Sequence, residues 1–225
     1  MTYPIRAIAF DMGHVLIDFE HFVFCQNMVP CCDGLTATQI YQKLFGDYIT
    51  TNWWNNYEKG HTKTNVFVAQ LKSKLGITDD EFHLEKLVEV VMTSFFLNEG
   101  ILEILDDLIA KKIPIFIISN ICELHWFAIY KKFSDLVDRF PKINRILSFE
   151  VGLRKPDSQI YFTVYQRFGS IYGFNSRGIQ DMLFIDDKKE NVLEFERLGG
   201  QAFIYDCRRF TIKSLARFIE EYKIW

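Results

Sequence analysis

The chain of 225 residues has few cysteines and no spacing of them that would staple a fold. The five cysteines are an odd number, Cys31 and Cys32 are adjacent, and no CxxC pair occurs. A disulfide framework is therefore not expected, and neither is a zinc site. The simpler interpretation is a set of reduced thiols, which predicts a cytoplasmic protein.

Long apolar runs and long runs of one charge are also missing. No apolar stretch approaches the length that spans a bilayer, and residues 1–10 lack the basic-then-apolar build of a signal peptide. The net charge is −3 without a long block of one sign, so composition gives no reason to propose nucleic acid as a partner. We predict a globular protein with neither a membrane nor a nucleic-acid partner, and we leave its assembly open between monomer and homodimer.

Repeats and low-complexity linkers are absent as well, and the chain instead alternates short apolar runs with helical patterns. The apolar runs cover residues 5–10, 113–118, 146–149, 182–185 and 202–205. Strands that alternate with helices are typical of a parallel sheet with helices on both faces. The predicted fold class is α/β, with a doubly wound, parallel, Rossmann-like sheet of five or more strands.

Between the first and second of these runs the sequence looks helical. Residues 18–96 lack a strong strand pattern, Thr36 is suited to cap a helix, and residues 78–81 are expected to start another. We predict a small helical cap domain at 18–96, inserted into a core domain of residues 1–17 and 97–225. The cap also carries aromatic residues, Trp53, Trp54 and Tyr57, which we interpret as core rather than as pocket lining.

Polar residues follow four of the predicted strands. They are Asp11, the pair Ser119 and Asn120, Lys155, and the pair Asp186 and Asp187. Because the carboxyl ends of parallel strands share one edge, these groups should converge in one crevice. Three carboxylates there would raise one another's pKa unless a cation neutralised them, and oxygen ligands suit Mg²⁺. Each residue has a structural alternative when taken singly: a cap for Ser119, a solvated charge for Lys155 and a helix N-cap for Asp187.

Four motifs, in this order, resemble those of the haloacid dehalogenase-like (HAD) hydrolases. They are Phe-Asp-Met-Gly-His-Val-Leu at 10–16, Ile-Ser-Asn at 118–120, Gly-Leu-Arg-Lys-Pro-Asp at 152–157 and Phe-Ile-Asp-Asp-Lys-Lys-Glu-Asn-Val at 184–192. The resemblance covers the whole chain, and the helical insert resembles the small cap of that family. The first motif is similar to an Asp-x-Gly-x-Val subset that includes sugar-phosphate phosphatases.

The resemblance implies a phosphatase of a small phosphorylated metabolite, with Asp11 as the nucleophile that forms an aspartyl-phosphate. It implies a Mg²⁺ site made by the side chains of Asp11, Asp186 and Asp187 and by the backbone carbonyl of Gly13. It also implies that the phosphoryl group and the substrate are held by Ser119, Asn120 and Lys155, with Ser119 and Lys155 taking part in catalysis.

One position departs from the phosphatase pattern. Phosphatases of this family usually carry a second aspartate two residues after the nucleophile, where it protonates the leaving alcohol, and here that position is Gly13. Candidate replacements are His14, Asp18, Glu58 and His61, and for His14 we favour a turn residue that points to solvent or to the cap. The alternative functions are a haloacid dehalogenase, which would use Asp11 without a metal, and a binding or regulatory protein on a weakened enzyme scaffold.

Overall fold

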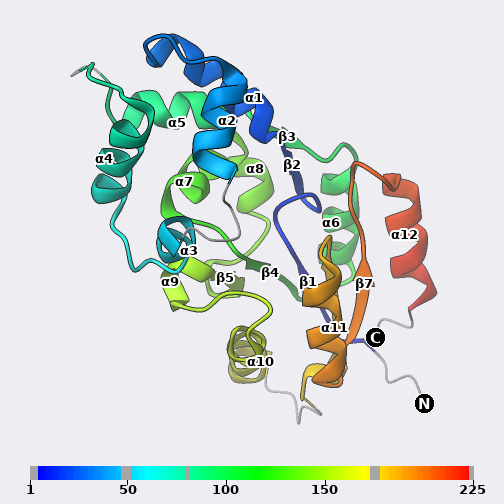
Figure 1. Cartoon of the computed structure of the whole chain (residues 1–225). Coiled ribbons are helices and arrows are strands. Elements are labelled where there is room, and N and C mark those ends of the chain that lie inside the picture. The colour runs from blue at the N-terminus through cyan, green and yellow to red at the C-terminus, as the bar shows by residue number, and fades with distance from the viewer. Residues whose placement is uncertain (1–4, 47–51, 80–81, 173–177, 223–225) are drawn as a thin grey trace.

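The structure, a computed structural model, describes residues 5–46, 52–79, 82–172 and 178–222 (Figure 1). Within them it has a parallel sheet of five strands in the order β5-β4-β1-β6-β7. The strands are β1 (Ala7–Phe10), β4 (Ile115–Ser119), β5 (Arg145–Leu147), β6 (Met182–Asp186) and β7 (Gln201–Ile204). The predicted α/β fold class with a five-stranded parallel sheet is confirmed.

The central strand β1 is buried on both faces because its residues alternate between two apolar layers. Ile8 and Phe10 pack with helices α6 (Ile101–Ala110) and α12 (Ile212–Glu221). Ala7 and Ala9 pack on the other face with α10 (Ser158–Tyr172) and α11 (Lys189–Arg197). Such two-sided burial explains why the strand reads as a continuous apolar run.

The strand order reverses beside β1. The chain passes from β1 to β4 and β5 in one direction, and then returns to β6 and β7 on the other side. Phe10 lies opposite Ile117 of β4 and Ile185 of β6, so Asp11 and Asp186 follow at neighbouring strand ends. A reversal of this kind opens a crevice at the carboxyl ends of the strands, where open α/β sheets bind their ligands.

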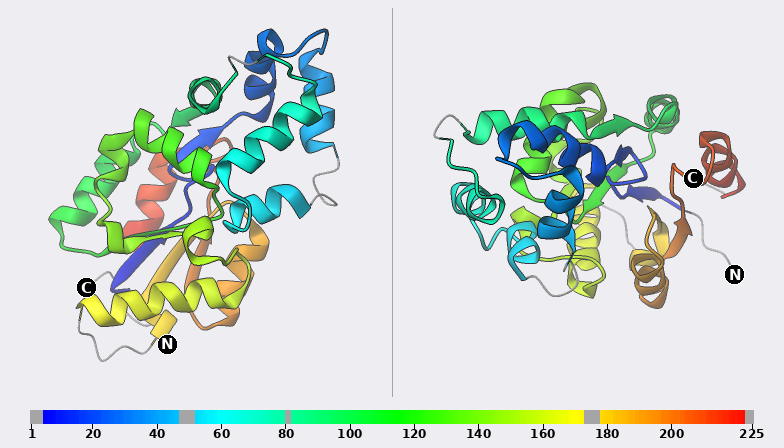
Figure 2. Two further views of the ribbon diagram at one scale, coloured as in Figure 1. Left: turned by 90° about the vertical axis from the view of Figure 1, so that its left-hand side faces the viewer. Right: turned by 45° about the horizontal axis from the view of Figure 1, so that its top comes forward.

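Helices of the inserted segment lie together at one end of the molecule (Figures 1 and 2). They are α1 (His21–Met28), the 3₁₀ turn η1 (Val29–Cys31), α2 (Ala37–Phe45), α3 (Asn52–Glu58), α4 (Thr64–Leu75) and α5 (Leu84–Thr93). Thr36 caps α2 as predicted, because its side chain accepts from the Gln39 amide while the Gln39 side chain accepts from the Thr36 amide.

The predicted start of α5 is wrong. The helix begins at Leu84 rather than at 78–81, of which residues 80 and 81 lie outside the described part of the chain. The Lys72 ammonium donates to the carbonyls of Asp79 and Phe82, at 2.7 and 3.4 Å, and so holds this segment against the end of α4. The sequence pattern gives no signal for this contact between the end of α4 and the residues after it.

A second difference is a short antiparallel ribbon that the sequence pattern does not indicate. Strand β2 (Ile17–Phe19) pairs with β3 (Phe95–Leu97), and Phe19 lies opposite Phe95. Strands of three residues are too short for an alternation to stand out. Both predicted domain boundaries, 17/18 and 96/97, fall within this ribbon, and we retain them as a proposal.

The remaining helices flank the sheet. They are α7 (Glu123–Lys132), α8 (Ser134–Val137), α9 (Ser148–Val151) and the 3₁₀ turns η2 (Lys142–Asn144) and η3 (Gly178–Asp181). Strand β5 ends at Leu147, so the strand predicted at 146–149 is only partly confirmed. Residues 148 and 149 belong to α9, which begins at Ser148. Within the described residues, no helix combines the length and the apolarity that crossing a bilayer requires.

Candidate active site

A cavity of about 140 Å³ lies where the strand ends meet the inserted helices. All the predicted site residues line it except Asp186, which is completely buried. Lys155 makes the connection between them. Its ammonium lies 2.8 Å from Asp11 Oδ1 and 2.6 Å from Asp186 Oδ2. The residues predicted at four separate strand ends therefore lie close together in the structure.

The charge on Lys155 is fixed by its surroundings. Burial disfavours the ammonium, but the carboxylates of Asp11 and Asp186 outweigh that cost and hold the pKa of Lys155 above its usual range. Only 3% of the residue is exposed, so the two ion pairs are poorly screened by solvent. The two carboxylates therefore favour the charged form of Lys155.

Asp186 is held more tightly than its neighbours. Its Oδ1 accepts from the Lys188 amide at 2.8 Å, and both carboxylate oxygens accept from Asn191 Nδ2, at 2.9 and 3.0 Å. Sequence reasoning assigned no role to Asn191. The signal was available, because Asn191 lies in the first turns of the helix that follows the strand, within reach of the strand end.

Three carboxylates at this place suit a divalent cation. One ligand oxygen from each of Asp11, Asp186 and Asp187 lies within 4.8 Å of the others. Burial raises the pKa of Asp11, with Asp186 and Asp187 adding to the effect and Lys155 opposing it. Burial and Asp186 likewise raise the pKa of Asp187. One lysine leaves the cluster with excess negative charge, and hard oxygen donors fit Mg²⁺.

The β4 end contributes Ser119 and Asn120. Ser119 is 97% buried yet lines the cavity. The Asn120 side chain is engaged by the backbone of Lys155: its Nδ2 donates to the Lys155 carbonyl at 2.9 Å and its Oδ1 accepts from the Lys155 amide at 2.7 Å. Asn120 therefore acts on the site by positioning Lys155. Below, Asp11, Ser119, Lys155, Asp186 and Asp187 are called the polar floor.

Gly13 has room for a side chain. A Cβ built on Gly13 would meet no atom within 4 Å, and the residue does not adopt the left-handed backbone region. Its neighbour His14 does, with φ of 55°, in keeping with the turn predicted for it. The His14 imidazole also lines the cavity, and its Nδ1 lies 2.7 Å from Asp18 Oδ1.

Of the two cap residues considered as acids, Glu58 lines the cavity, whereas His61 is exposed and does not. Glu58 Oε1 accepts from Trp54 Nε1 at 3.0 Å, and Oε2 lies 2.7 Å from Arg154 Nε. The Glu58 carbonyl also accepts from Ser148 Oγ at 2.6 Å, which ties α3 to the core. This ion pair between α3 and the loop after α9 was not predicted, because nothing local links residues 58 and 154.

The aromatic residues of α3 divide between core and cavity. Trp53 and Tyr57 stack on Phe67, with ring centroids 4.9 and 4.0 Å apart, which confirms the core interpretation for these two. Trp54 instead lines the cavity.

Solved structures share this architecture. A predicted HAD-like family hydrolase from Porphyromonas gingivalis superposes with a TM-score of 0.73 and 21% identity, over 96% of this chain and 98% of that one. A HAD family enzyme from Bacteroides thetaiotaomicron, crystallised with magnesium and inorganic phosphate, gives 0.73 and 18%, over 94% and 98%. The chain has the haloacid dehalogenase-like fold. The HAD resemblance is thus confirmed at the level of the fold.

Sequence comparison adds two relatives from Aspergillus species, although no family model matches this chain. A sesquiterpene phosphatase of Aspergillus oryzae is 24% identical over 208 residues, which cover 88% of this chain and 89% of that protein. A drimenol cyclase of Aspergillus calidoustus is 24% identical over 205 residues, or 89% of this chain. The match covers 34% of the cyclase, so the chain spans about a third of that protein's length.

Proposed function

We propose that this chain is a magnesium-dependent phosphatase that hydrolyses a small phosphorylated metabolite through an aspartyl-phosphate on Asp11. The observation that carries the proposal is the arrangement of the floor. The Asp11 carboxylate faces a cavity, lies 2.8 Å from a buried ammonium and shares a possible cation site with two further carboxylates. Phosphoryl transfer needs such a site, because an anionic nucleophile must approach an anionic substrate.

The comparisons support the same activity. One structural neighbour was crystallised with magnesium and inorganic phosphate, and one sequence relative along nearly the full chain is a sesquiterpene phosphatase. Neither fixes the substrate of this chain, because both are less than 25% identical to it.

Each floor residue has a role that its position allows. One oxygen of Asp11 attacks phosphorus as the P–O bond to the alcohol breaks, while Lys155 and the Ser119 hydroxyl compensate the charge on the phosphoryl oxygens. Water then attacks the aspartyl-phosphate, which releases inorganic phosphate and restores the Asp11 carboxylate. Asn120 holds Lys155 in place through its backbone, and Asn191 holds Asp186. The carboxylates of Asp11, Asp186 and Asp187, with the Gly13 carbonyl, would hold Mg²⁺, which supplies charge neutralisation and polarises the phosphoryl oxygens.

Gly13 has no side chain that could act as a general acid. With no carboxyl there to protonate the leaving oxygen, the enzyme should favour leaving groups that tolerate negative charge, such as aryl, acyl or anomeric oxygens. A positioned acid typically contributes about 10²- to 10⁴-fold, so simple alkyl phosphates should be slower by a factor of that order.

Metal removal tests the proposal. Excess chelator should abolish hydrolysis of an aryl phosphate, and added Mg²⁺ should restore it. Asp33→Asn is the matched control for the nucleophile variant Asp11→Asn discussed below. Asp33 is an exposed carboxylate outside the cavity, so this change should not alter turnover. Aryl phosphate turnover that persists in chelator would contradict the metal-dependent mechanism, whereas release of chloride from 2-chloropropionate in chelator would favour a dehalogenase. Absence of turnover in both conditions would favour a binding protein.

A further inference from the structure

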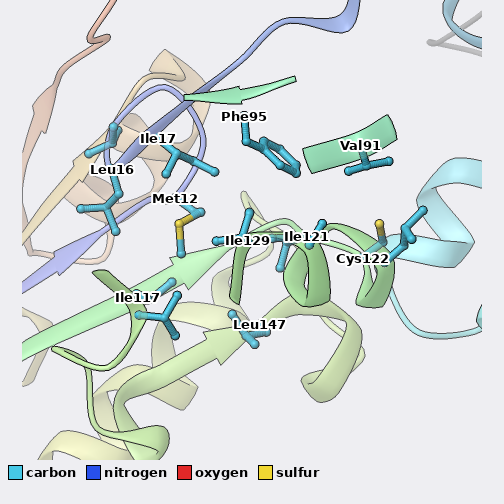
Figure 3. Close-up of a cluster of buried hydrophobic side chains, with 14 of the residues drawn as sticks. Met12, Leu16, Ile17, Val91, Phe95, Ile117, Ile121, Cys122, Ile129 and Leu147 are labelled. Atoms are coloured by element: carbon cyan, nitrogen blue, oxygen red, sulfur yellow. The ribbon is translucent and has the colours of Figure 1, made fainter. Parts of the chain in front are cut away.

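Part of the cavity wall comes from the inserted segment, the ribbon and α7 rather than from the strand ends, and it is made mostly of hydrocarbon. We call this part the apolar wall. It consists of Ile17, Phe19, Trp54, Phe95, His125 and Ile129. Ile17, Phe95 and Ile129 belong to one buried cluster with Met12 and Ile121, which also line the cavity (Figure 3). The polar floor therefore borders on a continuous apolar surface.

The rings of the apolar wall are already packed against one another. Phe19 lies 4.8 Å from Phe95 and 5.3 Å from His125, measured between ring centroids. Trp54 lies 5.4 Å from His125, and His21 packs edge-on against Phe19 at 4.6 Å. Aromatic contacts at these distances are favourable and fix the side chains in place. The wall is a preformed surface rather than a set of side chains that a ligand would have to order.

The wall carries no charged side chain, and its only polar side-chain atoms belong to Trp54 and His125. Burial lowers the pKa of His21 to about 4 and that of His125 to about 3, so both imidazoles are neutral near pH 7. Trp54 Nε1 already donates to Glu58, and the Glu58 carboxylate lies beside Arg154. Hydroxyl groups placed against this surface would give up water and find few partners, which is costly. Hydrocarbon placed there would gain from leaving water.

Resting on the phosphatase activity proposed above, we infer that the substrate is a phosphate ester whose alcohol carries an apolar body, rather than a polyhydroxylated sugar phosphate. The phosphate occupies the floor, and the body lies against Phe19, Trp54 and Phe95. The cavity of about 140 Å³ is close to the volume of an engineered apolar cavity that holds benzene, and here it must hold the phosphate as well. Only the part of the body nearest the phosphate is therefore enclosed, and the rest would extend through the mouth.

A matched pair of substrates tests the inference on the unmodified protein. Cyclohexylmethyl phosphate and glucose 6-phosphate both carry a six-membered ring on a primary leaving oxygen, and they differ mainly in ring hydroxyls. Each methylene buried is worth about fourfold in binding, so kcat/KM should favour cyclohexylmethyl phosphate by about 10- to 100-fold. Equal values, or a preference for glucose 6-phosphate, would overturn the inference.

A variant of the wall locates the preference. Phe19→Thr keeps a strand-forming residue but removes the ring, and it should lower the ratio of kcat/KM for cyclohexylmethyl phosphate over acetyl phosphate about tenfold. Phe127→Thr is the control, because Phe127 is a 56% exposed residue of α7 outside the cavity, and its ratio should not change. An unchanged ratio in Phe19→Thr would contradict the role of the wall.

Acetyl phosphate separates the two proposals, since it has an acyl leaving group and no sizeable body. If the wild type fails to hydrolyse acetyl phosphate with Mg²⁺, the proposed function itself is wrong. If it hydrolyses acetyl phosphate and prefers glucose 6-phosphate to its cyclohexyl analogue, the phosphatase stands and the apolar substrate class is wrong.

Discussion

The apolar wall and the polar floor, apart from the fully buried Asp186, face the same cavity but are held together in different ways. Floor residues fix one another by ion pairs and hydrogen bonds, as where Lys155 lies 2.8 Å from Asp11 and 2.6 Å from Asp186. Wall residues are fixed by ring contacts, as between Phe19 and Phe95. Under the two proposals above, the floor would serve any phosphate, whereas the wall would discriminate by the carbon body. Substitutions in the floor should affect all substrates alike, and those in the wall should depend on the substrate.

The largest effect should come from the nucleophile. Asp11→Asn keeps the shape of the side chain but removes its charge, so turnover should fall by about 10⁴-fold or more on aryl, acyl and alkyl phosphates alike. The measurement is kcat/KM for one phosphate of each type, with circular dichroism to show that the fold is kept. A loss confined to one substrate type would break the distinction between floor and wall.

The next largest effect should come from the buried ammonium group of Lys155. Lys155→Met leaves Asp11 and Asp186 as buried carboxylates without their partner, which should cost about 3 to 5 kcal/mol of unfolding free energy in chelator. Saturating Mg²⁺ should recover part of the loss, because the metal supplies the missing positive charge. Urea unfolding with and without Mg²⁺ measures both quantities. Equal losses in the two conditions would argue against a cation site among these carboxylates.

A smaller effect concerns the leaving group. The space around Gly13 accepts a side chain, so Gly13→Asp should raise kcat/KM for alkyl phosphates relative to aryl phosphates by about tenfold or more. The ratio is measured in both proteins with the same pair of substrates. A wild type that handles both leaving groups equally well would mean that another acid is in place, and Glu58 and His14, which both line the cavity, would be the residues to substitute.

An effect of similar size is expected in the wall, and it depends on pH. Burial lowers the pKa of His125 to about 3, whereas a histidine in an unfolded chain has a pKa near 6.5. The unfolded state therefore binds the extra proton first as pH falls below about 6.5, and native stability declines until the pH reaches about 3. At pH 5 this amounts to about 2 kcal/mol.

His125→Phe keeps an aromatic ring and removes the titration. The difference in urea stability between pH 7.5 and pH 5 should therefore shrink by about 2 kcal/mol relative to the wild type. An unchanged difference would show that His125 is not held neutral by its surroundings.

The floor was predictable from the sequence and the wall was not. Asp11, Ser119 and Asp186 lie at the carboxyl ends of β1, β4 and β6, and Lys155 lies in the loop beyond β5 and α9. Parallel strands bring their ends together whatever lies between them. The wall draws on the ribbon, α3 and α7, and residues such as Phe95 and Ile129 have the same apolar character as core residues. Nothing in a single sequence separates an apolar side chain that lines a cavity from one that fills a core, as Trp53 and Trp54 show.

Long-range polar contacts were hidden for a similar reason. The buried pair of Glu58 and Arg154 joins residues of cap and core that are far apart in the chain, at 2.7 Å. The side chain of Asn120, expected at the substrate, is taken up by the backbone of Lys155. The residue types predict that these side chains have polar partners, but the tertiary arrangement determines which partner each side chain has.

Direct detection of the covalent intermediate tests the central claim. The protein is mixed with an aryl phosphate and Mg²⁺, quenched in acid within one turnover, digested and examined by mass spectrometry. We expect a phosphoryl adduct on the peptide that carries Asp11, absent from Asp11→Asn and from samples with excess chelator. A phosphoryl group on a different residue, or an adduct that forms equally well in chelator, would contradict the mechanism.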